Sequence, residues 1–179
     1  ILPPELLYKD DIKTPVKYVF YPLGQKKIVV GRAVYAGKDN FGRPGNYFFH
    51  NFIFSKEDFE ASGRNPVSLI RSIEKNNLFS ESFSESQKRY NEINYSYSPK
   101  QKFLSMENKD NLFKIIFITS HIFEIKHPIW LYGDDKEVLD FLEGLFYSLP
   151  FHLRELLSFD TYAYGINIRT KTIGIPVSD

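Results

Sequence analysis

Residues 42–50 bring together the side chains best suited to chemistry; they read Gly-Arg-Pro-Gly-Asn-Tyr-Phe-Phe-His. Their glycines and proline predict a tight turn, because Gly reaches positive φ and Pro presets φ for a turn. From such a turn Arg43 could grip a carboxylate or a phosphate with two parallel hydrogen bonds, and Asn46 could orient it. His50 could bind the same group or move a proton. This stretch is the candidate functional site, although it does not indicate a particular reaction.

The strand expected after this turn limits what the site can do. Residues 47–54 are largely aromatic and predict a β-strand, on which Asn46 and His50 share one face. Asn46 and His50 would then lie about 13 Å apart, which is too far for a catalytic pair. A purely structural role also stays open, in which Arg43 and Asn46 bond loop carbonyls and His50 is a hydrogen-bonded core residue.

The residues that enzymes and metal sites need are scarce in the rest of the chain. There is no cysteine, which excludes disulfides, cysteine-bound zinc and a thiol nucleophile. The other histidines, His121, His127 and His152, show no metal-binding spacing. The phosphate-binding loop, the dinucleotide-binding glycine pattern and the Gly-x-Ser-x-Gly elbow are all missing. We therefore expect no catalytic residue, no metal and no cofactor, and the sequence favours a protein that is not an enzyme.

A polar stretch over residues 76–102 offers a different kind of surface. It interleaves aromatic with basic side chains, as grooves for single-stranded nucleic acid do. The residues concerned are Tyr90, Tyr95, Tyr97, Lys88, Arg89, Lys100 and Lys102. A solvated insert would show the same pattern, and 23 Lys and Arg against 22 Asp and Glu give no general attraction to nucleic acid. Nucleic-acid binding is therefore an alternative that is not favoured.

The composition indicates one domain over residues 1–179, with residues 76–102 as a polar insert. Hydrophobic residues make up 42% of the chain and aromatic residues 17%, which supports a packed core. No apolar run approaches the roughly 20 residues that a membrane-spanning helix needs, so no membrane association is expected. The absence of cysteine fits a cytoplasmic protein. Because the first residue is Ile1, we expect a piece of a longer protein.

Strand and helix signals alternate without the regular rhythm of a parallel α/β protein. In the first half, β-branched and aromatic runs and an Asn-Pro helix start predict strands at 16–21, 27–36 and 47–54 and a helix at 65–75. The second half predicts a strand at 112–119 (whose length also allows a helix), a strand at 127–132, helices at 134–148 and 150–157, and paired strands at 158–168 and 171–177. These elements predict an α+β fold, with a mixed, mostly antiparallel sheet packed by amphipathic helices.

Two segments, Tyr35–His50 and Leu149–Tyr162, carry motifs in an order that resembles the N-terminal domain of the bacterial GTPase-associated protein 1 family. The positions that match the family's motifs are Asp39, Gly42, Arg43, Gly45, Asn46, His50, Arg154, Ser158 and Thr161. The two glycines, Ser158 and Thr161 are expected to be structural.

The resemblance implies an ancillary role beside a GTPase in a bacterial conflict or defence system, with no established catalysis. It also implies that the chain is the N-terminal part of a longer protein, and that its partners are a GTPase or other proteins of the same system. The candidate binding residues are Asp39, Arg43, Asn46 and His50, with Arg154 nearby. The alternative is a sensor or an enzyme that binds a small anion, such as a nucleotide, at Arg43, Asn46 and His50.

Overall fold

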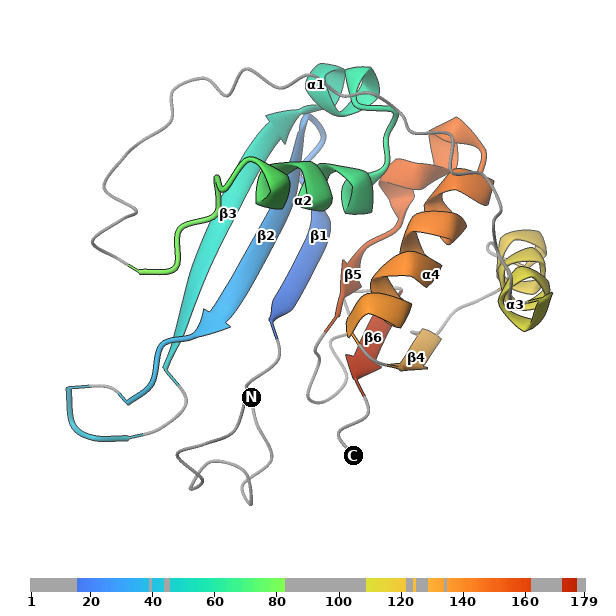
Figure 1. Ribbon diagram of the computed structural model, residues 1–179. Helices are drawn as coiled ribbons and strands as arrows, with labels where there is room; N and C mark the ends of the chain where they lie inside the picture. Colours follow the sequence, from blue (N-terminus) through green and yellow to red (C-terminus); the bar gives the residue numbers. More distant parts are fainter. Residues whose placement is uncertain are drawn as a thin grey trace.

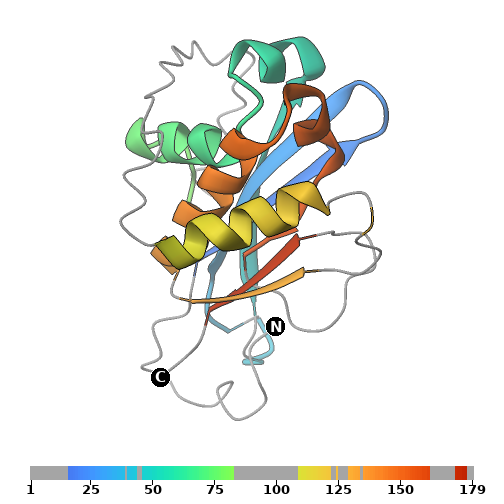
Figure 2. The same cartoon turned by 90° about the vertical axis from the view of Figure 1, so that its right-hand side faces the viewer.

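The computed structural model describes residues 16–38, 40–43, 46–82, 109–121, 124, 129–133, 135–161 and 172–176. Its elements are, in chain order, β1 (Lys17–Leu23), β2 (Lys27–Tyr35), β3 (Tyr47–Ser55), α1 (Lys56–Ala61), α2 (Pro66–Lys75), α3 (Lys109–Ser120), β4 (Ile129–Gly133), α4 (Asp135–Ser148), the 3-10 helix η1 (Phe151–Leu156), β5 (Phe159–Asp160) and β6 (Thr172–Pro176). The strands form one sheet in the order β3-β2-β1-β5-β6-β4. Helices α2 and α4 cover the same face of it (Figure 1, Figure 2). The predicted α+β fold is confirmed.

The first three strands form an antiparallel meander. The β1–β2 turn contains Gly24 at φ +64°, a conformation that glycine adopts without strain. Strands β2 and β3 pair over their whole length, from Lys27 opposite Ser55 to Tyr35 opposite Tyr47. The predicted hairpin is therefore confirmed. Loop 37–46, which carries the candidate site and is called the candidate loop below, lies at its tip.

Helices α1 and α2 begin where their capping residues predict. The Ser55 side chain accepts a hydrogen bond from the Asp58 backbone N–H, which satisfies one of the unpaired donors at the start of α1. The Asn65 side chain does the same for α2, and Pro66 is the first helical residue. The Asn65 amide also donates to the Glu143 carbonyl of α4 at 3.2 Å, so this cap joins two helices.

The strand predicted at 112–119 is wrong, because this segment forms helix α3. Ile115 and Ile118 are buried in the core, whereas Phe113, Ile116 and Phe117 are exposed. Burial thus recurs after three residues, as on a helix, and not after two, as on a strand. The sequence does not distinguish the two, because a continuous apolar run shows neither the helical period nor the two-residue period of a strand.

The last two strands of the chain pair differently from a hairpin. A pairing of 158–168 with 171–177 across a short corner predicts antiparallel strands. Instead β6 lies between β5 and β4 and is parallel to both. Strand β5 covers only two residues, and residues 162–171 lie outside the described part of the chain. The sheet is mixed, as predicted, but its parallel part was not expected at this place.

The core lies between the sheet and the helices, with Phe20 of β1 at its centre. The Phe20 ring contacts those of Phe59, Phe146 and Phe159, with centroids 5.5, 5.5 and 5.8 Å away. All four side chains are buried. Their elements, β1, α1, α4 and β5, come from both halves of the chain, so both halves share one core.

Candidate functional site

The candidate loop is closed at its base by backbone hydrogen bonds. Ala36 N–H donates to the Asn46 carbonyl at 2.8 Å, and Asn46 N–H donates to the Gly37 carbonyl at 3.2 Å. Gly37 has φ +82°, which explains why glycine suits this position. Asn46 therefore extends the β2–β3 pairing, with its side chain exposed. The loop lies at the end of the hairpin far from α1 (Figure 1).

The tip of the loop presents an aromatic ring and a guanidinium together. Phe41 is 83% exposed, and the Arg43 guanidinium lies over its ring at 5.2 Å from the centroid. Gly42 between them has φ +75°. Asp39 and Gly45, two further predicted site residues, lie outside the described residues. The described part of the loop thus offers a stacked apolar and cationic surface to solvent.

The His50 side chain packs among aromatic rings on the core side of the sheet. Its Nδ1 accepts a hydrogen bond of 2.8 Å from the Ser80 backbone N–H, so the neutral ring carries its proton on Nε2. Its ring packs against Phe52 and Phe79, with centroid distances of 4.6 and 5.9 Å. Burial lowers the pKa of His50 below its usual value, and the positive charge of Arg32 lowers it further. His50 is therefore neutral at physiological pH, and its Nδ1 is engaged by the Ser80 backbone N–H.

Arg32 is a residue of this site that the sequence reasoning missed. It lies opposite His50 on β3 and opposite Tyr18 on β1, so the three side chains form a row across the sheet. Its Nη2 is 3.1 Å from a Glu81 carboxylate oxygen, and its Nη1 is 3.9 Å from Glu74. A lone Arg inside the apolar strand β2 was the available signal, because a buried charge needs nearby partners.

This row fixes the chain where it leaves α2. The Arg32 guanidinium lies 5.0 Å from the Phe79 ring centroid, and the Tyr18 hydroxyl donates to Glu74 at the end of α2. Together with the Ser80–His50 bond, these contacts hold residues 78–82 against the sheet. The Arg32 charge is compensated by two carboxylates, which favours an anchoring role over the capture of an anion.

The pH dependence of stability tests this anchor. Protonation of His50 would turn Nδ1 into a donor and remove the Ser80 bond. Because the folded-state pKa is lowered, the unfolded chain binds more protons, so stability is full above about pH 6.5 and falls as pH falls toward the folded pKa. We expect the urea midpoint to drop between about pH 7.5 and about pH 5.5, and to drop less in His50→Gln.

The control for this experiment is His152→Gln, which removes an exposed histidine from η1. We expect this variant to follow the wild type. The same pH dependence in His50→Gln and in the wild type would contradict the assignment of the effect to His50.

Arg154 lies at the opposite end of the molecule from the candidate loop. Its Nε and Nη2 donate to the carbonyls of Leu149 and Tyr147 at the end of α4, both at 3.0 Å. Its Nη1 donates to the carbonyl of Gly63 at 2.8 Å. Gly63 follows α1, which continues from the end of β3 that is far from the loop. The structure therefore does not bring Arg154 near Arg43.

The two remaining predicted motif residues lie in the packed interior. Thr161 is buried; its Oγ1 accepts from Tyr18 N–H and its own N–H donates to the Tyr18 carbonyl, both at 2.9 Å. Ser158, also buried, precedes β5. Thr161 thus continues the pairing of β1 with β5 through its side chain.

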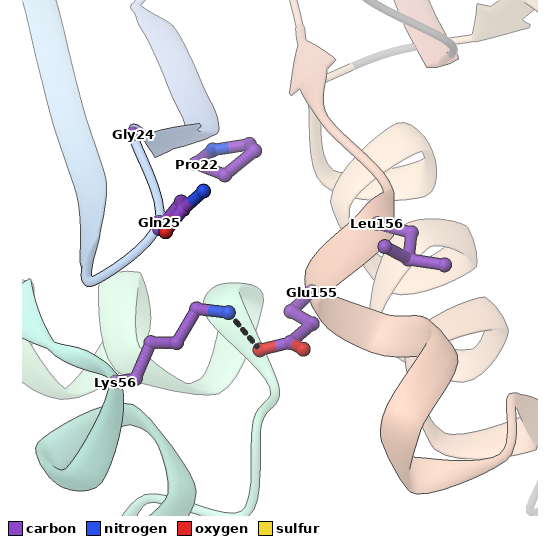
Figure 3. A pocket seen from close by; sticks show the side chains of 6 residues that line it. All are labelled: Pro22, Gly24, Gln25, Lys56, Glu155 and Leu156. Atoms are coloured by element: carbon purple, nitrogen blue, oxygen red, sulfur yellow. Dashed lines mark ion pairs between the residues drawn. The ribbon is translucent and has the colours of Figure 1, made fainter.

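A hollow beside the β1–β2 turn holds none of the predicted site residues (Figure 3). It lies between that turn and η1, and it is lined by Pro22, Gly24, Gln25, Lys56, Glu155 and Leu156. Lys56 and Glu155 form an ion pair of 3.3 Å at its edge. These charges already compensate each other, so the hollow offers little to a charged ligand.

Within the described part of the chain, no three His, Asp or Glu side chains gather to hold a metal ion. None of the described helices is long and apolar enough to cross a bilayer. The aromatic and basic residues of the polar insert, from Lys88 to Lys102, lie outside the described residues.

The family model of GTPase-associated protein 1, N-terminal domain type 2, matches residues 3–95, a little over half of the chain. The chain belongs to this family. The match includes the first motif, Tyr35–His50, but it ends before the second, Leu149–Tyr162, whose resemblance stays a prediction. No curated protein and no solved structure matches the chain significantly.

In this GTPase-associated domain, the candidate loop and the row of Tyr18, Arg32 and His50 both lie inside the matched residues. Arg43, His50 and Arg32 all lie there, on or beside the β2–β3 hairpin. The structure places Arg43 on the exposed tip and His50 in the row below it. The loop and the row are therefore two separate features of the same hairpin.

Proposed function

We propose that this domain is a non-catalytic adaptor of a GTPase-associated bacterial conflict or defence system, and that loop 37–46 binds its protein partner. The observation that carries the proposal is the exposed pair of Phe41 and Arg43 at the loop tip. Aromatic and Arg side chains are enriched at protein interfaces, where a few residues carry most of the binding energy. The partner we propose is the GTPase of the same system, met in the cytoplasm.

The hairpin beneath the loop supports this role. The bonds between Ala36, Gly37 and Asn46 hold the base of the loop, and the rings of Tyr35 and Tyr47 pack edge to face below it at 5.6 Å. A loop on a rigid base loses less conformational entropy on binding, which favours affinity. Phe41 would bury a large apolar area against a partner, and Arg43 would pair with a carboxylate of that partner.

The structural contacts of His50 and Arg154 favour an adaptor over an enzyme. His50 accepts the Ser80 N–H, and Arg154 donates to three carbonyls far from the loop. Neither side chain stands beside Arg43 as a second functional group. The alternative, a small anionic ligand at Arg43, Asn46 and His50, has to join Arg43 on the exposed tip to a His50 ring that packs against Phe52 and Phe79, so we favour it less.

A pull-down tests the proposed interface. Wild-type chain, the double variant F41A/R43A and the control F113A/K114A would be used to capture proteins from host lysate, with and without a GTP analogue. The control removes an exposed Phe and Lys from α3, so it matches the chemistry of the change at another place. We expect the wild type and the control to retain the same GTPase, and F41A/R43A to lose it.

Two results would contradict the proposal. One is a GTPase retained equally by all three proteins, which would remove the loop from the interface. The other is a wild-type chain that retains no GTPase in either nucleotide condition.

A further inference from the structure

Strand β3 forms one edge of the sheet (Figure 1). Within the described residues it has a neighbouring strand on one side only, which is β2. An edge strand presents a row of backbone donors and acceptors that can pair with another strand. The orientation of these groups can be derived from the β2–β3 ladder.

Two hydrogen bonds fix the phase of that ladder. Ala36 N–H donates to the Asn46 carbonyl at one end, and Lys56 N–H donates to the Lys26 carbonyl at the other. In an antiparallel pair, bonded residues recur at every second position. The even-numbered residues of β3 therefore bond to β2. Its odd-numbered residues, which include Phe49, Asn51 and Ile53, turn their N–H and C=O groups to the edge.

The side chains of these odd-numbered residues lie on the face away from the core. Phe49 is 52% exposed and Ile53 is 59% exposed, whereas Phe52 between them is buried. The Asn51 side chain lies over Gly31 of β2, whose missing Cβ leaves the space for it. The edge thus combines outward backbone groups with two exposed apolar side chains that flank an Asn.

Strand β3 itself carries none of the sequence features that normally prevent pairing at an edge. Edge strands are usually short, or carry charged residues, Pro or bulges. Strand β3 has nine residues, and Tyr47–Ser55 contains no charged residue and no Pro. The opposite edge, β4, has five residues. Among the described residues, the longer edge is therefore the one that can pair with another strand.

We propose that β3 pairs antiparallel with β3 of a second copy of this chain, about a two-fold axis at Asn51. Asn51 is the middle residue of β3, so this register pairs the whole strand. Phe49 then faces Ile53 of the second copy, and Ile53 faces its Phe49. Aromatic side chains opposite β-branched ones are favourable cross-strand pairs. No charge opposes a like charge, since the strand carries none, and the two sheets become continuous.

The dimer goes beyond the proposed adaptor role and is compatible with it. Antiparallel pairing puts the two 37–46 loops at opposite ends of the joined sheet, beyond the paired strands. Both Phe41–Arg43 tips then face outward. A pairing of one strand with another is a small interface, so the dimer is expected to be weak and to depend on concentration.

The test is sedimentation equilibrium of the whole chain over a concentration series from nanomolar to hundreds of micromolar. We expect a monomer–dimer equilibrium for the wild type and for the control Ile116→Lys, which places the same charge on exposed α3. Phe49→Lys and Ile53→Glu would each be monomeric, because each puts a charge opposite an apolar side chain. Circular dichroism would show that the variants stay folded.

A double variant makes the register itself testable. In F49K/I53E each new Lys faces a new Glu of the second copy, so the dimer should return and should weaken as salt is added. A wild type that stays monomeric throughout the series would overturn the proposal. So would a dimer that survives in both single variants, or one that the double variant does not restore.

Discussion

Arg154→Ala is expected to lower the free energy of unfolding by about 3 kcal/mol, because it leaves three carbonyls without their charged donor. The Arg154 guanidinium bonds Tyr147 and Leu149 at the end of α4 and Gly63 after α1. The guanidinium thus supplies donors for carbonyls that have no partner within the helix, and it links the end of α4 to Gly63 in the first half of the chain. Urea unfolding at constant pH would measure the loss.

Arg154→Lys is the matched control, since it keeps the charge but offers a point donor in place of a planar fork. We expect an intermediate loss. A loss below about 1 kcal/mol in Arg154→Ala would contradict the proposed role of these bonds. Where Arg154→Ala is folded, it should still retain the partner of loop 37–46, because the side chain lies at the far end of the sheet.

Asn65→Ala is expected to cost about 2 kcal/mol, through the loss of a cap and of a contact between helices. The Asn65 side-chain oxygen accepts from Val67 and Ser68 N–H groups, and its nitrogen donates to the Glu143 carbonyl. The residue is fully buried, so none of these groups gains water as a substitute. Denaturant unfolding again gives the measurement.

Ser55→Ala provides the comparison for this second change. Ser55 caps the six-residue helix α1 at a half-buried position, where its hydroxyl accepts from the Asp58 N–H and donates to the Asp58 carboxylate. We expect a loss of about 0.5–1 kcal/mol, clearly smaller than for Asn65→Ala. Equal losses in the two variants would show that the bond from Asn65 to Glu143 adds nothing.

Local signals explain why much of the first half could be predicted from sequence. The β-branched run of β2, the turn residues of the loop and the Asn65-Pro66 helix start each specify their structure within a few residues. The hairpin and α2 follow from them. Their positions depend little on the rest of the chain.

The second half depended on tertiary contacts that the sequence does not display. Helix α3 was predicted as a strand because its apolar run has residues for both a buried and an exposed face, such as Ile115 and Phe117. The parallel position of β6 between β5 and β4 arises from long-range pairing. No local motif specifies the neighbour of a strand in such a sheet.

The residues of the candidate site stay predictions, and the structure separates them into two features of the hairpin. The sequence drew attention to Arg43 and His50 in one stretch, but the strand alternation and the Ser80 bond assign His50 to the row with Arg32. The pairing of Arg32 with His50 requires the register of β2 and β3, which the loop length alone does not define. The sequence does not indicate a role for Phe41, because its contact with the Arg43 guanidinium depends on the conformation of the loop.

The most direct test of the adaptor role is the affinity of this chain for the GTPase that it retains. Isothermal titration calorimetry would compare the wild type with F41A/R43A and with F113A/K114A. We predict binding at least about tenfold weaker for F41A/R43A, which corresponds to about 1.4 kcal/mol, and unchanged binding for the control. Equal affinities for all three proteins would contradict the assignment of loop 37–46 as the partner-binding surface.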